Sequence, residues 1–136
     1  MDPEIINISA DVDVMSARLK ARQLAGEIGI SGSDLTLLAT AISEVARNIV
    51  QYAGSGEIEF SSVVVSGRRG LAVIARDQGP GITDIEQAMQ DGFTTSRGMG
   101  MGLPGAKRLM DDFEIISETG KGTIVRMVKW ERSNDF

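Results

Sequence analysis

Two polar side chains in this sequence are suited to chemistry on a phosphate group. Glu44 and Asn48 are four residues apart in a segment of helical periodicity, so both project from one face about one turn apart. The amide oxygen of Asn48 is a suitable ligand for Mg²⁺, and the carboxylate of Glu44 could orient or deprotonate an attacking hydroxyl or water. The alternative is that the two residues belong to an exposed polar stripe on an amphipathic helix. Without further motifs, this alternative explains the pair better than a catalytic role does.

A second acidic side chain stands where a predicted strand ends. Asp77 follows the run 71–76, and Gly79 and Gly81 come directly after it. A carboxylate there can accept a hydrogen bond from an exocyclic amine such as the adenine 6-amino group, while the glycines let a flat base approach the backbone. The alternative is an ordinary turn rich in glycine and proline.

Alternating glycines form the third candidate. Gly98, Gly100 and Gly102 lead into a predicted helix that begins near Leu103. Free amides in such a loop and at a helix start can wrap a phosphate chain, and Arg97 could stabilise charge on a group being transferred. The loop matches neither the P-loop nor the dinucleotide fingerprint. A flexible surface loop with a solvated arginine explains the same residues equally well.

Composition excludes several classes of mechanism. The 136 residues contain no histidine and no cysteine, which removes Ser-His-Asp and thiol hydrolases, imidazole or thiolate zinc sites and phosphohistidine relays. The formal charge of -5 disfavours nucleic acid and anionic membrane surfaces as partners. Protein and small-molecule partners are therefore favoured.

Length and hydropathy predict a single domain over residues 1–136 in the cytoplasm. The length suits one hydrophobic core, and no apolar stretch approaches the ~18 residues of a membrane span. The acidic start has neither the basic segment nor the apolar run of a signal peptide.

The elements that must position these side chains can be outlined from periodicity and turn residues. The first half predicts a strand at 4–9, a helix that starts at Asp11 or Asp13 and ends at Gly29, and a long helix from Ser33 or Asp34 to about Ala53. The apolar side chains that indicate the first helix are Met15, Leu19, Leu24 and Ile28.

The second half predicts mostly strands. The expected elements are strands at 57–66 and 71–76 joined by a turn at 66–70, a short helix at 84–90, a loop at 91–102, a helix at 103–112, strands at 113–118 and 123–130, and a loose tail at 131–136. This order predicts an α/β two-layer sandwich in which helices cover one face of a mixed, mostly antiparallel sheet.

Together the motifs resemble the boxes of the GHKL ATPase family. The matching segments are Glu44-x-x-x-Asn48, Asp77-x-Gly79-x-Gly81, Gly98-x-Gly100-x-Gly102-Leu103 and Gly120-x-Gly122-Thr123. The resemblance implies a Bergerat-type ATP-binding fold whose cofactors are ATP and Mg²⁺. It also implies that Asn48 holds Mg²⁺, Asp77 reads adenine, Thr123 supports the adenine side, Glu44 is the general base and 91–103 is a lid over the phosphates.

Segments 42–49 and 93–103 are most similar to small bacterial serine/threonine kinases and anti-sigma factors of that family. That similarity implies phosphorylation of a serine or threonine on a STAS-domain antagonist protein of a stress-signalling complex, the stressosome. It further implies binding and activation of a downstream phosphatase or other effector. The rival hypothesis is an anti-sigma factor or binding module in which ATP shapes a docking surface with little turnover. The glycines of 91–102 predict a loop that closes over nucleotide.

Overall fold

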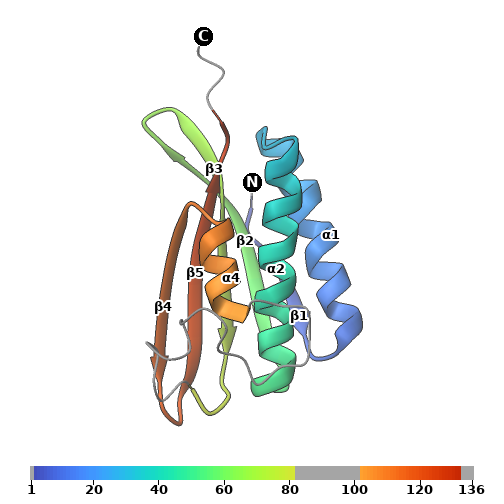
Figure 1. Ribbon diagram of the computed structural model, residues 1–136, viewed down its shortest axis with the longest axis vertical. Helices are drawn as coiled ribbons and strands as arrows, with labels where there is room; N and C mark the ends of the chain where they lie inside the picture. The colour runs from blue at the N-terminus through green and yellow to red at the C-terminus, as the bar shows by residue number, and fades with distance from the viewer. Residues whose placement is uncertain (1, 82–101, 133–136) are drawn as a thin grey trace.

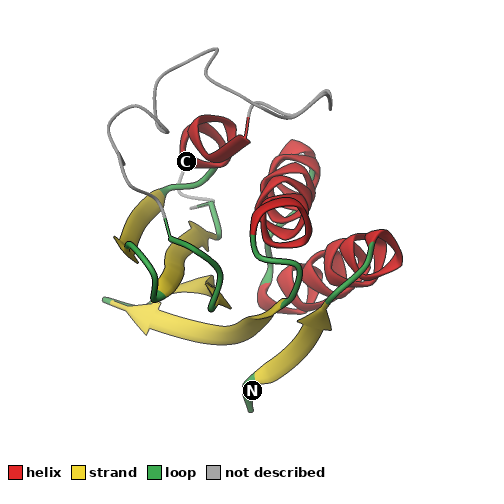
Figure 2. Ribbon diagram, turned by 90° about the horizontal axis from the view of Figure 1, so that it is seen from below, coloured by secondary structure: helices red, strands yellow, loops and turns green. Residues whose placement is uncertain are grey.

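The computed structural model describes residues 2–81 and 102–132, which form one sheet and a layer of helices (Figure 1). The elements are β1 (Glu4–Ile8), α1 (Asp11–Ile28), α2 (Ser33–Tyr52), β2 (Gly56–Val65), β3 (Arg68–Asp77), α4 (Gly102–Leu109), β4 (Asp112–Glu118) and β5 (Gly122–Trp130). Figure 2 shows that α1, α2 and α4, the helices of the described residues, lie on one face of the sheet, which confirms the predicted two-layer sandwich. The short helix expected at 84–90 and most of the loop expected at 91–102 lie outside the described residues.

The sheet has the strand order β1-β2-β3-β5-β4, and every neighbouring pair is antiparallel. The prediction of a mixed sheet was therefore wrong for the strands that the structure describes. The physical reason is that short turns join β2 to β3 and β4 to β5, and a tight hairpin can pair its strands only in antiparallel. The first of these turns contains only Ser66 and Gly67, both with positive φ, so it is shorter than the predicted 66–70.

Alternation along the strands decides which side chains meet the helices. On β5 the helix-facing residues are Thr123, Val125, Met127 and Lys129, because Val125 and Met127 belong to the buried core and residues two apart share a face. The same row is therefore apolar in the middle of the strand and polar at both of its ends. Each of these two polar ends belongs to a polar cluster that is described below.

Helix α1 buries only two of the four apolar residues that indicated it, namely Leu24 and Ile28. Met15 and Leu19 are 53% and 59% exposed, although both fit the periodic apolar pattern of the helix. The buried face is built mainly from small residues, with Ala17 and Ala21 fully buried against the core. Small side chains let α1 approach α2 closely, so tertiary packing outweighed residue size in choosing the face.

The predicted helix starts and ends hold with small shifts. Asp13 accepts hydrogen bonds from the backbone N–H groups of Ser9 and Ala10, while Ala10 is the N-cap residue in place of the expected aspartate. Gly29 ends α1 in the left-handed conformation, as predicted. Helix α4 ends at Leu109, three residues before the predicted boundary.

The predicted tail at 131–136 is held at its first two residues. The carboxylate of Glu131 bonds Arg69, and the guanidinium of Arg132 pairs with Asp34, so these residues are anchored by charge. Residues 133–136 lie outside the described part of the chain. Among the described residues, no helix has the length and apolar content to span a membrane.

Candidate functional site

Helix α2 presents Glu44 at the edge of the core. Glu44 is only 8% exposed and follows a strongly apolar stretch of the helix. Its Oε1 accepts a hydrogen bond from Arg47 Nη1 at 2.9 Å, and its Oε2 accepts one from the backbone N–H of Gly102 at 3.2 Å. The carboxylate is therefore aimed at the first residue of α4, and the interpretation of Glu44 as part of an exposed polar stripe is wrong.

Arg47 is a partner of Glu44 that the sequence did not assign. The two residues are three apart on α2, and this spacing was the available signal, because side chains three apart on a helix are neighbours. The Arg47 side chain is about half exposed, so its guanidinium reaches the carboxylate from the solvent side.

Asn48 lies one turn beyond Glu44 on the same helix and is half-buried. Among the described residues, no group of three or more acidic side chains is placed to hold a metal ion. A cation here would therefore rely on few protein oxygens, with nucleotide phosphates and water completing its shell. That donor set fits Mg²⁺, which typically keeps several waters and takes one or two protein ligands.

A polar row crosses three strands at the end of the sheet near the C-terminal end of α2. Asp77 is the last residue of β3 and is in register with Thr123 of β5, which is in register with Ser117 of β4. Thr123 is buried, and its hydroxyl lies 2.9 Å from the hydroxyl of Ser117. The structure thus brings the two candidate residues Asp77 and Thr123 together. Sequence reasoning missed Ser117, whose signal is its place opposite Thr123 in the last hairpin.

Asp77 also forms a local turn with Gly79. An ordinary turn of this kind was the alternative to adenine binding. The Asp77 Oδ1 accepts a hydrogen bond from the Gly79 N–H at 3.0 Å. A carboxylate has a second oxygen and several acceptor sites, so this turn and a nucleotide contact are compatible.

The glycines after Asp77 are required by close packing. A Cβ on Gly79 would lie 2.7 Å from the Cβ of Ala53 at the end of α2. Gly81 has φ of +78°, and a Cβ there would collide with the carbonyl oxygen of Glu118. The loop is therefore wedged between α2 and the turn that joins β4 to β5.

The turn between β4 and β5 closes on the same loop. Gly120 donates its N–H to the carbonyl oxygen of Pro80 at 2.7 Å. Gly122 has φ of +113°, and a Cβ at this position would collide with the Asp77 carbonyl oxygen. Two glycine motifs that are about forty residues apart in sequence thus form one compact unit around Asp77.

A pocket of about 390 Å³ opens at this end of the sheet, at the ends of β1, β2 and β3. Its walls include Asp77 and Gln78, together with the charged side chains of Glu57 and Arg76. Neither Glu44 nor Asn48 lines it, so this pocket is separate from the space in front of α2.

The remaining predicted site residues fall into two groups. Arg97, Gly98 and Gly100 lie outside the described residues, as does most of the lid predicted at 91–103. Gly102 and Leu103 open α4, where the Gly102 N–H meets Glu44 and the Leu103 side chain is buried. Leu103 therefore anchors the start of the helix.

The fold and these motifs agree with the comparisons to known proteins. Residues 8–129 match the histidine kinase-like ATPase domain family, so the chain belongs to this family of GHKL-type ATP-binding domains. Over 131 residues it is 48% identical to the serine/threonine-protein kinase RsbT of Bacillus subtilis, with 96% of this chain and 98% of that protein covered. It is also 33% identical to an anti-sigma F factor of Thermoanaerobacter over 84% of this chain and 82% of that protein.

Solved structures share the fold. The RsbU and RsbW domains of a Mycobacterium tuberculosis protein superpose with a TM-score of 0.65 at 20% identity, covering all of this chain and 34% of the other. The chain thus spans about a third of the length of that solved chain. The mycobacterial sensor histidine kinase MprB gives a TM-score of 0.58 at 20% identity, with 95% and 97% of the two chains covered.

Proposed function

We propose that this chain is a Mg-ATP-dependent protein serine/threonine kinase that phosphorylates a STAS-domain antagonist in a partner-switching stress pathway. The observation that carries the proposal is the Glu44 carboxylate, held by Arg47 and the Gly102 N–H one turn from Asn48. The identity of 48% to a serine/threonine kinase over nearly the whole chain supports the same activity.

In the proposed reaction Glu44 is the general base. The hydroxyl oxygen of the partner's serine or threonine attacks the γ-phosphorus of ATP, the bond between that phosphorus and the ADP oxygen breaks, and the hydroxyl proton passes to Glu44. Arg47 and the Gly102 N–H orient the carboxylate before the reaction. Asn48 would hold Mg²⁺, which supplies positive charge to the phosphates when it is bound.

The remaining roles concern nucleotide binding. Asp77 would accept the adenine 6-amino hydrogen bond, with Thr123 beside it on β5. The expected phosphate contacts of Arg97, Gly98 and Gly100 rest on the sequence motif alone. Together these groups would bind ATP and leave Glu44 to act on the acceptor hydroxyl.

Similarity to the serine/threonine-protein kinase RsbT and to an anti-sigma F factor supports the partner-switching part of the proposal. After phosphorylating the antagonist, the protein would bind and activate a downstream phosphatase or other effector. Because it consumes ATP and acts on signalling proteins, we expect it to work in the cytoplasm.

The test is transfer of labelled γ-phosphate from Mg-ATP to a STAS-domain antagonist encoded near this protein. Asn48→Ala should abolish the label, because the proposed Mg²⁺ ligand is lost. Gln23→Ala is the matched control, since Gln23 is exposed on α1 and does not line the pocket that contains Asp77. Nucleotide binding without any labelled antagonist would contradict the kinase proposal.

A nucleotide-gated anti-sigma factor is the second candidate, and the 33% identity to an anti-sigma F factor favours it. This role predicts a stable ATP-dependent complex with a sigma factor. Co-purification of such a factor in the presence of ATP, without transfer to any STAS-domain protein, would replace the kinase proposal with this one.

A further inference from the structure

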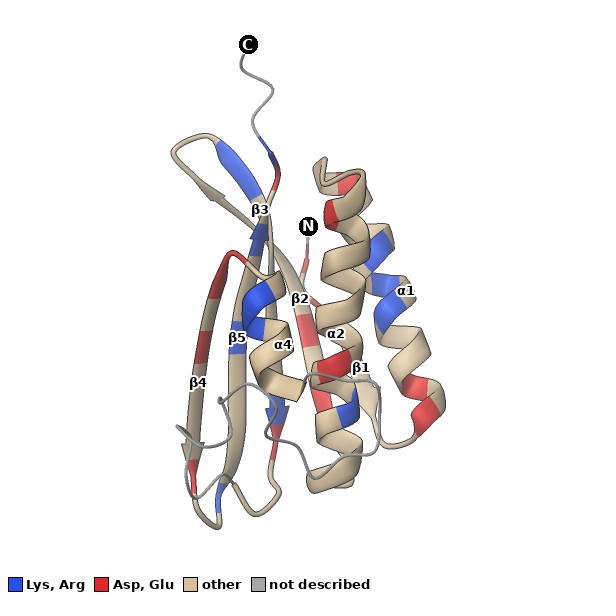
Figure 3. Cartoon of the chain, in the orientation of Figure 1, with Lys and Arg blue, Asp and Glu red and all other residues tan. Residues whose placement is uncertain are grey.

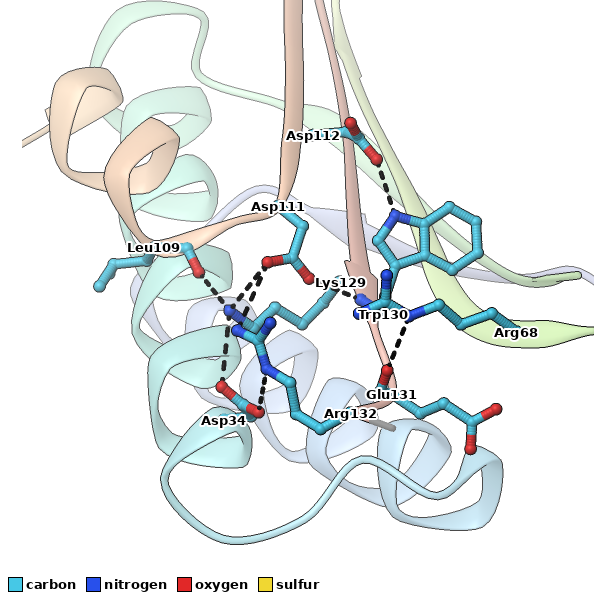
Figure 4. Close-up of polar contacts among 9 residues, drawn as sticks. All are labelled: Asp34, Arg68, Leu109, Asp111, Asp112, Lys129, Trp130, Glu131 and Arg132. Carbon is cyan, nitrogen blue, oxygen red and sulfur yellow. Dashed lines mark hydrogen bonds and ion pairs between the residues drawn. The ribbon is translucent and has the colours of Figure 1, made fainter. Parts of the chain in front are cut away.

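One lysine side chain is enclosed in the protein at the end of β5 opposite to Thr123. The Lys129 side chain is 3% exposed. Its Nζ donates a hydrogen bond to the carbonyl oxygen of Leu109 at 2.9 Å and lies 3.7 Å from carboxylate oxygens of both Asp34 and Asp111 (Figure 4). Burying an ammonium group has a large desolvation cost, and an apolar side chain can often replace a buried ion pair without loss of stability. A role beyond packing is therefore expected.

The partners of Lys129 belong to three different parts of the fold. Asp34 lies in the first turn of α2, Leu109 is the last residue of α4, and Asp111 directly precedes β4. We call Lys129 and these three partners the lysine joint. Arg132 reinforces it from the solvent side, with Nε 3.0 Å from an oxygen of Asp34.

Helix α4 needs such fixation because it is short. It has eight residues and includes a proline and a glycine after its first position. Helices of this length are marginal in water without tertiary contacts, and glycine lowers helix propensity further. Its apolar contact with α2 comes from the buried residues Leu103, Pro104, Gly105 and Ala106.

Polar contacts hold both ends of α4. At the first residue the Gly102 N–H donates to Glu44, and at the last residue the Leu109 carbonyl accepts from Lys129. A carboxylate at the start and an ammonium at the end both match the helix dipole. The last turn of α4 also carries Lys107 and Arg108, and in Figure 3 this helix has blue but no red segments, which means that it has basic but no acidic residues.

The two end contacts join the same pair of helices. Helix α2 carries Asp34 near its start and Glu44 further along, while α4 starts at Glu44 and ends at the lysine joint beside Asp34. At about 1.5 Å per residue, the span from Asp34 to Glu44 is about 15 Å and that from Gly102 to Leu109 about 10 Å. The helices therefore run antiparallel with both ends tied, as their side-by-side packing in Figure 1 shows.

We propose that Lys129 is a positioning residue for the phosphate-transfer site. By fixing the C-terminal end of α4 to Asp34 and Asp111, it holds the Gly102 N–H against the Glu44 carboxylate. Loss of the ammonium group lets α4 shift along α2, and Glu44 then keeps Arg47 but loses its backbone donor. The catalytic consequence rests on the proposed function, whereas the dependence of the Gly102 hydrogen bond on Lys129 does not.

The first experiment measures amide hydrogen exchange by NMR on the full chain. In Lys129→Met the Gly102 amide should exchange about tenfold faster than in the wild type, because its hydrogen bond opens more often. Lys129→Arg, which retains a cation, should restore much of the protection. The matched control is Arg126→Met on the same strand, since Arg126 lies outside the joint and is exposed. Equal protection of Gly102 in Lys129→Met and in this control would overturn the proposal.

The second experiment tests whether Lys129 acts through Glu44. Lys129→Met should lower kcat for phosphate transfer about tenfold with KM for ATP nearly unchanged, and should lower it no further in a Glu44→Gln background. Effects that multiply would show that Lys129 acts on another part of the site. If the wild type transfers no phosphate at all, the proposed function fails, and the exchange experiment still decides whether Lys129 positions Gly102.

Discussion

The two ends of helix α4 are held by opposite charges, which differ in the number of their polar partners. At the start, the Glu44 carboxylate accepts from one backbone N–H and from Arg47, whose side chain is half exposed. At the end, the enclosed ammonium group of Lys129 is surrounded by a carbonyl and two carboxylates. Both arrangements satisfy the helix dipole.

The difference shows how one short helix can serve both stability and chemistry. A carboxylate that is to accept a proton needs partners that orient it and still leave an oxygen accessible to substrate. A joint between three elements needs a partner for every buried polar group, because each unsatisfied buried group would destabilise the fold. The lightly held end therefore faces the proposed reaction, and the enclosed end anchors the helix.

The largest expected effect comes from removing the charge of Glu44. Glu44→Gln keeps the size of the side chain and an acceptor for the Gly102 N–H but removes the proposed base. We expect phosphate transfer to fall by about 10²–10⁴-fold, the usual loss for a general base. Single-turnover transfer from labelled ATP measures it, with Glu59→Gln on the open face of the sheet as control. A transfer rate equal to that of the control would remove Glu44 from the mechanism.

Among these variants, removing the charge of Lys129 should cause the largest loss in the free energy of unfolding. Lys129→Met leaves Asp34 and Asp111 without their inner cation, and breaking a buried pair in this way costs about 3–5 kcal/mol. Arg132 remains to compensate in part, so the lower end of that range is expected. Urea denaturation measures the free energy of unfolding. A loss no greater than that of Arg126→Met would mean that the joint contributes little.

A much smaller effect is expected from the outer cation of the same region. The Arg132 side chain is 58% exposed, and exposed ion pairs contribute about 0–1 kcal/mol. Arg132→Ala should therefore lower the free energy of unfolding by less than Lys129→Met does, in the same urea series. The reverse order would show that the solvent side of the joint is the main anchor.

The smallest effect should be a pH dependence at Glu131. Hydrogen bonds from the side chain and backbone of Arg69 lower the pKa of Glu131 below its ordinary value of 4.5. A lowered pKa stabilises the fold above the ordinary value, and this contribution is lost as pH falls through the folded-state pKa. The difference in Tm between wild type and Glu131→Gln should therefore be present at neutral pH and shrink in acid. A difference that grows in acid would contradict this assignment.

Much of the fold could be predicted because local signals agree with the tertiary arrangement. Strand alternation, the glycine that ends α1 and the glycine turns between strands gave elements whose boundaries moved by only a few residues. The exposed face of α1 could not be predicted, because Met15 and Leu19 fit a helical period as well as the buried Ala17 and Ala21 do. Packing against α2 chose between the two faces.

In the candidate site, too, some residues could be predicted from the sequence and others could not. The spacing of Glu44 and Asn48 and the glycines around Asp77 marked their positions, since helix geometry and positive φ restrict which residues can stand there. Ser117 and Lys129 carried no motif. Each gains its partners through strand register or through contacts with elements distant in the chain.

The sequence by itself determined the elements, the glycine turns and the residue types able to bind Mg²⁺ and nucleotide, because these depend on spacing of a few residues. Only the tertiary structure decided that Glu44 meets Gly102, that Asp77 lies beside Thr123 and that Lys129 joins three elements. Those contacts join residues far apart in the chain. Their geometry is set by the packing of helices on a sheet, which short-range patterns do not encode.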